Sequence, residues 1–426
     1  MILIIVLRSS AKMKTKLLFT VLTTVLFHQS TPQCFPPYAG QQPSKNTHSD
    51  LYGGQQDFSL ALLNAINKIM PKENLFFSPY STYHALLIAY FMAGGQTESY
   101  LKKVLRLQEN EGKSDVYAAY KIDKFMTQFI AKNAPYEFTS ANKIYVSDEV
   151  PVRECVANDF PQELEKFAFK KDPEGSRVAI NNWVENTTHH MITDLLPPGT
   201  IDSSTDLVLV NAAYFKGIWE NKFNPELTKQ EIFYVNPSKQ IMVDMMHVEG
   251  TFRHDISEAL GAHILELPYK GENISMFILL PPFSNTEDSI DATLKSLSLE
   301  NFRKIVDKDS LISRTVQVAL PKFSLETTIE LVPALEHMGI GNLFQSSANL
   351  TALTDGKLHL GNALHKARIE VNEEGTKAAA ATVLFSFRSS RPAEPAQFIC
   401  NHPFIYLIYD QVQNAILFGG LFRRPY

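Results

Sequence analysis

The stretch ARIEVNEEGTKAAAATVLFSFRSSRP, residues 367–392, carries conflicting conformational signals near the C-terminus. Its four consecutive alanines favour a helix, the apolar run after them favours a strand, and its Arg/Ser/Pro ending is typical of an exposed loop. In a strand, every second side chain from Thr376 to Ser386 would face one way, and none of these carries a charge, because Lys377 falls on the other face. An unpaired charge is costly to bury, so this face is suited to insertion into a sheet. An alanine-rich exposed helix or a disordered loop is the alternative that the pattern leaves open.

The composition is that of a globular protein. The 426 residues are 45% hydrophobic and 20% charged, and the net charge of −5 is spread along the chain. No basic block favours a nucleic-acid partner. Length alone suggests about two or three domains, but no proline-rich boundary divides residues 51–426, so we expect one large domain there.

The N-terminal region has the pattern of a secretory leader. Lys14 and Lys16 precede the apolar run LLFTVLTTVLF at residues 17–27, which ends in polar residues. This pattern predicts a signal peptide over about residues 1–30 and a secreted, extracellular protein; a buried strand is the alternative. The apolar run at residues 2–7 is too short to span a bilayer, and we expect no membrane partner. The methionine just before the two lysines is an alternative start.

The cysteines and sequons are few. Three cysteines are too few for a disulfide framework, and their odd number leaves at least one without a partner in the chain, unless the first departs with the leader. Three Asn-X-Ser/Thr sequons are compatible with export and are the predicted glycosylation sites. The cysteines are Cys34, Cys155 and Cys400, and the sequon asparagines are Asn186, Asn273 and Asn349.

Hydrophobic periodicity predicts an α+β fold with a largely antiparallel sheet. Residues 31–50, rich in Pro, Gly and polar residues, are expected to form a flexible arm. Helical patterns crowd the first half of the chain and strand patterns the second, without β-α-β alternation. Helices are expected from Asp57, in the segment that ends at Gly94-Gly95, from Thr97, and over about 115–131 and 177–193; strands are expected at 142–146, 206–214, 263–268, 274–280, 315–320 and 404–409.

No motif favours an enzyme or a metal site. The chain has no G-x-S-x-G, phosphate-binding loop or dinucleotide-binding glycine motif before a helix. The neighbouring carboxylates Glu373 and Glu374 would point to opposite faces of a strand, so they cannot act together as acid and base. No Cys/His cluster has the spacing of a zinc site, and His189-His190 is expected to be solvated. We therefore expect no catalytic activity, cofactor or metal.

Five segments resemble the serpins, in the order in which that family has them. The resemblance spans about residues 55–426, and it implies a single serpin domain over residues 51–426. That domain would have three β-sheets, eight or nine helices and an exposed reactive-centre loop at about residues 373–397. The segments are NLFFSPYS (74–81), LVLVNAAYFKGIWENKF (207–223), ALPKFSLETTIELVPALEHMGIGNLF (319–344), ARIEVNEEGTKAAAAT (367–382) and FICNHPFIYLIYDQVQNAILFGGLFRRP (398–425).

The resemblance also implies a suicide mechanism against proteases. The target cleaves the loop and forms an acyl-enzyme with it, and the freed loop inserts into the main sheet, which distorts the protease. The native state must then be metastable. About fourteen new strand residues, at roughly 0.5–1.5 kcal/mol for each hydrogen bond, give on the order of 10 kcal/mol. This equals the whole net stability of an ordinary domain, about 5–15 kcal/mol.

Family roles carry over to named residues. Lys377 departs from the family's usual acidic residue but lies on the outward face, and Cys400 within the C-terminal segment is expected to be structural. A polar cluster called the shutter lies beneath the place where the sheet opens, and Trp219 belongs to the so-called breach. The hinge residues are Glu373, Glu374, Gly375, Thr376, Ala378, Ala379, Ala380, Ala381 and Thr382; the shutter residues are Ser78, Ser81, Asn211 and His365.

The reactive bond is expected between Arg388 and Ser389. An aspartate in the primary pocket of trypsin-like proteases pairs with arginine, and a small serine suits the other side of the bond. Counting from Gly375, as in most inhibitory members, gives Ser389–Ser390 as the alternative; some members have a hinge one residue shorter.

Two other bonds in the loop are weaker candidates. Arg391 precedes Pro392, whose ring disfavours cleavage, and this also counts against reading Arg388-Ser-Ser-Arg391 as a furin-type motif. Phe387 would be a chymotrypsin-type site.

The resulting hypothesis is a secreted inhibitor of trypsin-like serine proteases that acts as a monomer. The chain resembles arthropod haemolymph serpins, which implies a role in restraining an extracellular cascade of innate immunity or melanisation. A non-inhibitory serpin, acting as a carrier, storage protein or chaperone, is the alternative. A glycosaminoglycan cofactor has only weak support, from basic residues that could form one surface or a solvated face: Lys102, Lys103, Arg106, Lys121, Lys124 and Lys132.

Overall fold

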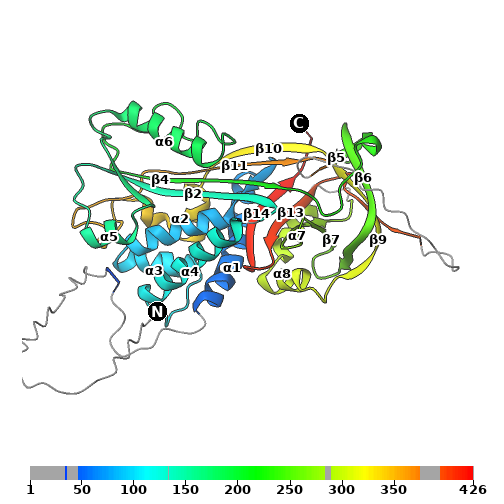
Figure 1. The fold of residues 1–426 in the computed structure, drawn as a ribbon, viewed down its shortest axis with the longest axis horizontal. Coiled ribbons are helices and arrows are strands. Elements are labelled where there is room, and N and C mark those ends of the chain that lie inside the picture. The colour runs from blue at the N-terminus through cyan, green and yellow to red at the C-terminus, as the bar shows by residue number, and fades with distance from the viewer. Residues whose placement is uncertain (1–33, 36–46, 133, 284–288, 375–393, 426) are drawn as a thin grey trace, which may run out of the picture.

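The computed structural model describes residues 34–35, 47–132, 134–283, 289–374 and 394–425 (Figure 1). The leader lies outside the described residues. So do the hinge from Gly375 to Thr382 and the candidate reactive bonds at Arg388, Ser389 and Ser390.

Nine α-helices form within the described part of the chain. The buried helix α2 begins at Pro79, whose fixed φ suits the first turn, and the Ser78 Oγ accepts a hydrogen bond from the Ser81 N–H at 3.0 Å. The helices are α1 (Thr47–Ile69), α2 (Pro79–Met92), α3 (Gly95–Val104), α4 (Lys113–Ala131), α5 (Glu154–Asp159), α6 (Pro173–Thr187), α7 (Ser289–Ser296), α8 (Leu299–Val306) and α9 (Val332–Met338).

The strands alternate in burial where one face of a sheet meets the core, as in β10, and are wholly buried at the centre of the molecule, as in β13 and β14. They are β1 (Leu75–Phe77), β2 (Tyr136–Ser147), β3 (Leu164–Phe167), β4 (Leu207–Gly217), β5 (Lys229–Asn236), β6 (Lys239–Ser257), β7 (Ala262–Pro268), β8 (Ile274–Leu280), β9 (Ile312–Pro321), β10 (Phe323–Glu330), β11 (Ala363–Val371), β12 (Ala396–Ile399), β13 (Phe404–Asp410) and β14 (Ala415–Phe422). Every strand predicted from the sequence overlaps one of these.

Five strands form the main sheet, in the order β10-β11-β4-β2-β3. Most neighbouring strands elsewhere are antiparallel, but β11 runs parallel to β4 and β3 runs parallel to β2. Helix α6 lies over one side of the main sheet, and α1 to α4 lie on the other (Figure 1).

The remaining strands join into a single second sheet of nine strands, where two further sheets were expected. The reason is the length of β6. This 19-residue strand pairs with β5 near Lys239 and with β7 near Ser257, and it pairs with β9 along its middle. One continuous strand thus joins two groups of strands through hydrogen bonds.

Helix α1 begins at Thr47, ten residues before the expected start, so the last residues of the predicted arm (31–50) are helical. The Gly53-Gly54 pair concealed this from the sequence pattern. Gly54 is required by packing: a Cβ there would lie 2.9 Å from the carbonyl oxygen of Leu105, at the end of α3.

The start of the predicted arm is also held in place. Cys34 forms a disulfide with Cys155 of α5, and Phe35 packs against Tyr117 and Phe91 with ring centroids 5.5 and 5.6 Å apart. Cys400 is buried and free, as the odd cysteine count required of one residue. Among the described residues, no helix has the length and apolar character needed to span a bilayer.

Candidate functional site

The centre of the main sheet holds an incomplete parallel pairing. Strands β11 and β4 are in register from Ala363 opposite Leu209 to Arg368 opposite Tyr214. Beyond that point β11 continues to Val371 and β4 to Gly217 without pairing to each other. The two strands are therefore unpaired at the end where the chain leaves β11 for the predicted reactive-centre loop.

Trp219 closes the open end of this pairing. Its indole N–H donates to the Asn372 carbonyl oxygen at 2.9 Å, and its backbone N–H donates to that of Glu374 at 3.2 Å. Its ring stacks on Tyr269 with centroids 4.4 Å apart. The predicted breach residue thus holds the last described residues before the loop.

Glu373, a predicted hinge residue, is held by three contacts. Its carboxylate accepts a hydrogen bond from the Thr228 hydroxyl at 2.9 Å and forms an ion pair with Lys322 at 3.0 Å. Its carbonyl oxygen accepts from the Phe223 N–H at 2.9 Å. Burial alone raises the pKa of this carboxyl, but the Lys322 and Thr228 contacts outweigh burial and hold the pKa below its usual range.

The four predicted shutter residues come together beneath the β11–β4 pairing. The buried His365 ring accepts a hydrogen bond from the Ser78 backbone N–H at Nε2, at 2.9 Å, so its Nδ1 carries the proton and donates to the Asn211 side-chain oxygen, Oδ1. The Asn211 amide donates to the Ser81 hydroxyl at 2.7 Å. Burial lowers the pKa of His365 to about 3, so the ring is neutral at physiological pH.

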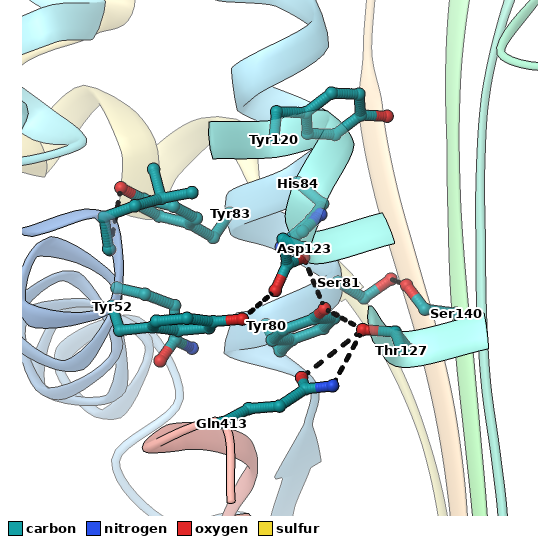
Figure 2. Close-up of polar contacts among 12 residues, drawn as sticks. Tyr52, Tyr80, Ser81, Tyr83, His84, Tyr120, Asp123, Thr127, Ser140 and Gln413 are labelled. Atoms are coloured by element: carbon teal, nitrogen blue, oxygen red, sulfur yellow. Dashed lines mark hydrogen bonds and ion pairs between the residues drawn. The ribbon is translucent and has the colours of Figure 1, made fainter. Parts of the chain in front are cut away.

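Two further residues extend the shutter across a third strand. Asn142 of β2 lies opposite Asn211, and its amide is 3.0 Å from the Ser81 hydroxyl. Ser140 donates to the same hydroxyl at 2.9 Å, and Figure 2 shows these two serines pointing toward one another. Neither residue was predicted from the sequence, although Asn142 stands in a predicted strand, because a polar residue in a strand usually indicates a solvated position.

A second buried polar cluster ties α4 to α1 and α2 (Figure 2). Asp123 of α4 accepts hydrogen bonds from the hydroxyls of Tyr52 and Tyr80, the latter at 2.8 Å, and lies 3.2 Å from His84. Burial lowers the pKa of His84, although Asp123 acts in the opposite direction. This cluster fixes the rotation of α4 about its own axis. It was not anticipated from the sequence.

Most of the basic residues considered for a glycosaminoglycan contact are engaged within the protein. Arg106 pairs with Asp57, Lys124 with Glu163, and Lys102 donates to backbone carbonyls of the segment before α4. Lys121 donates to the carbonyl oxygen of Asp159. These contacts compete with a sulfated ligand for the same charges.

The three sequon asparagines differ in accessibility. Asn186 and Asn273 are exposed. Asn349 is half-buried, and its side-chain oxygen accepts hydrogen bonds from the Thr351 N–H at 3.1 Å and hydroxyl at 2.7 Å.

We predict that His365→Ala lowers the free energy of unfolding by about 2–3 kcal/mol, because it leaves the buried Ser78 N–H without a partner and removes the imidazole donor from the buried Asn211 side-chain oxygen. A change in pH dependence is also expected. The folded pKa of about 3 lies below the unfolded value of about 6.5. The unfolded state therefore binds the proton first, and stability contributed by the neutral ring is complete above pH ~6.5 and is lost as the pH falls toward 3.

Urea unfolding of both proteins between pH 7.5 and pH 4 measures these effects. His190→Ala is the matched control, since His190 is exposed. Equal loss of stability on acidification in the parent and in His365→Ala would contradict the assignment.

Comparison with known proteins agrees with this geometry. The family model described as Serpin (serine protease inhibitor) matches residues 53–425. Serine protease inhibitor 88Ea of Drosophila melanogaster is 42% identical over 88% of this chain and 91% of its own length, and human Serpin B4 is 35% identical over 83% and 94%.

Solved structures give the same result. A crystal structure of maspin superposes with a TM-score of 0.81 at 25% identity, covering 89% of this chain and all of maspin. Uncleaved ovalbumin superposes with a TM-score of 0.77 at 27% identity, covering 88% of this chain and all of ovalbumin. Members of the matching family are protease inhibitors rather than enzymes. The chain belongs to the serpin family.

Proposed function

We propose that this serpin is a secreted suicide inhibitor of trypsin-like serine proteases, whose cleaved loop inserts between β11 and β4. The observation that carries the proposal is the parallel pairing of these strands, open at the end where the loop begins. A loop that leaves the end of β11 and turns back runs antiparallel to both strands. Insertion thus replaces one parallel pairing with two antiparallel ones, which are slightly more stable per residue.

The residues around the opening support this path. Glu373 and Asn372 are held by Trp219, Lys322 and their neighbours, so the chain turns back from a fixed point. In the residues that follow, every second side chain from Thr376 to Ser386 is uncharged. This face of the segment can enter a buried sheet without the cost of desolvating a charge. The insertion requires separation of His365 from Asn211, so the shutter controls when the sheet opens.

The proposed target class rests on the loop sequence. Arg388 is the residue that a trypsin-like pocket takes best, and the following Ser389 is small. A role in restraining an extracellular protease cascade, such as one of innate immunity or melanisation, extends this by analogy with the arthropod serpins that the chain resembles.

The proposed secretion has support from the described residues. The Cys34–Cys155 disulfide is of a kind that persists in oxidising compartments, and two sequons present exposed asparagines. The charges proposed for a glycosaminoglycan are largely engaged, so we expect inhibition without such a cofactor.

We predict that mixing the purified protein with trypsin yields a complex that survives a denaturing gel, together with a released C-terminal peptide that begins at Ser389. Arg388→Ala should slow inhibition of trypsin by about 100-fold or more, because it removes the charge that the protease pocket pairs with. The matched control is Ser390→Ala, which should inhibit like the parent. Equal inhibition by Arg388→Ala would exclude this reactive bond, and degradation without a complex would indicate a non-inhibitory serpin.

We predict that the full gene, expressed in insect cells, delivers the protein to the medium with an N-terminus near residue 31. A glycosidase that removes N-linked sugars should then reduce the mass of the protein. In the Asn186→Gln variant and in the Asn273→Gln variant, this loss of mass should be smaller by one glycan. N-terminal sequencing and intact mass measure both results. Retention inside the cell with residues 1–30 present would contradict secretion.

A further inference from the structure

The outer face of α4 carries four large apolar side chains that none of the other described elements covers. Ile122, Phe125, Met126 and Phe129 are 49%, 65%, 36% and 62% exposed. Their spacing places them on one side of the helix, and the rings of Phe125 and Phe129 stack with centroids 6.2 Å apart. We call these four residues the apolar crest.

The crest cannot turn inward, because the opposite face of α4 is fixed. Val116, Ala119, Tyr120 and Asp123 are buried on that face. Asp123 holds the hydroxyls of Tyr52 and Tyr80 in the cluster of Figure 2. Within the part of the chain that the structure describes, the crest therefore stays exposed, and large exposed apolar groups gathered in one place mark a contact surface.

Positive charge lies along one flank of the crest. Lys121 and Lys132 are exposed and eleven residues apart, which puts them within about 20° of each other around the helix. The Lys121 ammonium donates one hydrogen bond to the Asp159 carbonyl oxygen at 2.9 Å and keeps two further donors for an anionic headgroup. The two acidic residues of α4 offset this charge little. Asp123 is buried, and Asp115 is half-buried in the first turn of the helix. The exposed charge beside the crest thus favours an anionic partner.

The size of the crest favours an occupant other than a second copy of the chain. Given that a whole aromatic side chain covers about 150–250 Å², the four exposed side chains present on the order of 400 Å². Two crests would bury roughly 800 Å² in total, below the ~1,200–2,000 Å² of stable interfaces. A bilayer surface needs no matching partner surface, and Phe, Ile and Met flanked by Lys is the composition of interfacial helices.

We propose that the apolar crest docks this protein on anionic phospholipid surfaces, with α4 lying in the plane of the headgroups and Lys121 and Lys132 against the phosphates. No membrane partner was expected from the sequence, and no helix among the described residues can span a bilayer, but an interfacial contact requires no span. This contact is independent of the reactive-centre loop.

Flotation of the full-length secreted protein with vesicles tests the proposal. Wild type should float with vesicles of phosphatidylserine and phosphatidylcholine, and much less with phosphatidylcholine alone or at high salt. Phe125→Ser/Phe129→Ser should reduce the bound fraction about tenfold or more. Lys121→Gln/Lys132→Gln should reduce binding to the anionic vesicles and weaken its salt dependence.

The matched control is Ile256→Ser/Ile312→Ser, which removes two side chains of 59% and 57% exposure on the second sheet and should leave flotation unchanged. Unchanged thermal midpoints confirm that the variants are folded. Absence of wild-type binding to the anionic vesicles, or equal binding by the Phe125→Ser/Phe129→Ser variant, would overturn the proposal. A dimer in sedimentation velocity that the same variant abolishes would overturn the choice of a lipid occupant.

Discussion

The parallel pairing of β11 with β4 is the constraint on which the rest of the molecule depends. Two parallel strands that are neighbours cannot be joined by a short turn. The chain between β4 and β11 is therefore long, and it forms other elements before it returns to the sheet. A loop segment that turns back from the end of β11 and enters between the two strands runs antiparallel to both, so it can pair with each of them. The sheet is thus paired at its centre, unpaired at the end nearest the loop, and able to accept one more strand.

Two sets of side chains hold this pairing closed, and they differ in chemistry. At the open end, Trp219 and Lys322 fix the chain before the loop through backbone contacts and an ion pair. Beneath the pairing, the shutter uses neutral hydrogen bonds only, with His365 kept uncharged by burial. Neutral groups can exchange hydrogen-bond partners at a small net cost in free energy, whereas a charge left unpaired in the interior would be costly. Neutral hydrogen bonds therefore suit a contact that has to break and reform.

The sequence predicted those features that depend on local pattern. Strand alternation located the strands. The uncharged face from Thr376 to Ser386 lies outside the described residues, and its insertion into the sheet stays a prediction. Features that depend on distant partners were missed: Lys322 stands 51 residues before Glu373, and nothing near Cys34 indicates Cys155. The start of α1 was misplaced because a close backbone approach by α3 requires Gly54, and two glycines in a row normally indicate a helix end.

Metastability of the intact chain is the central physical claim, and differential scanning calorimetry of intact and loop-cleaved protein measures it. If the loop enters between β11 and β4 after cleavage, on the order of 10 kcal/mol of new hydrogen bonding should raise the thermal midpoint by roughly 10–15 °C. The cleaved protein should then unfold well above the intact one although it has one peptide bond fewer. A cleaved form that unfolds at the same temperature as the intact protein, or below it, would contradict insertion as the source of inhibition.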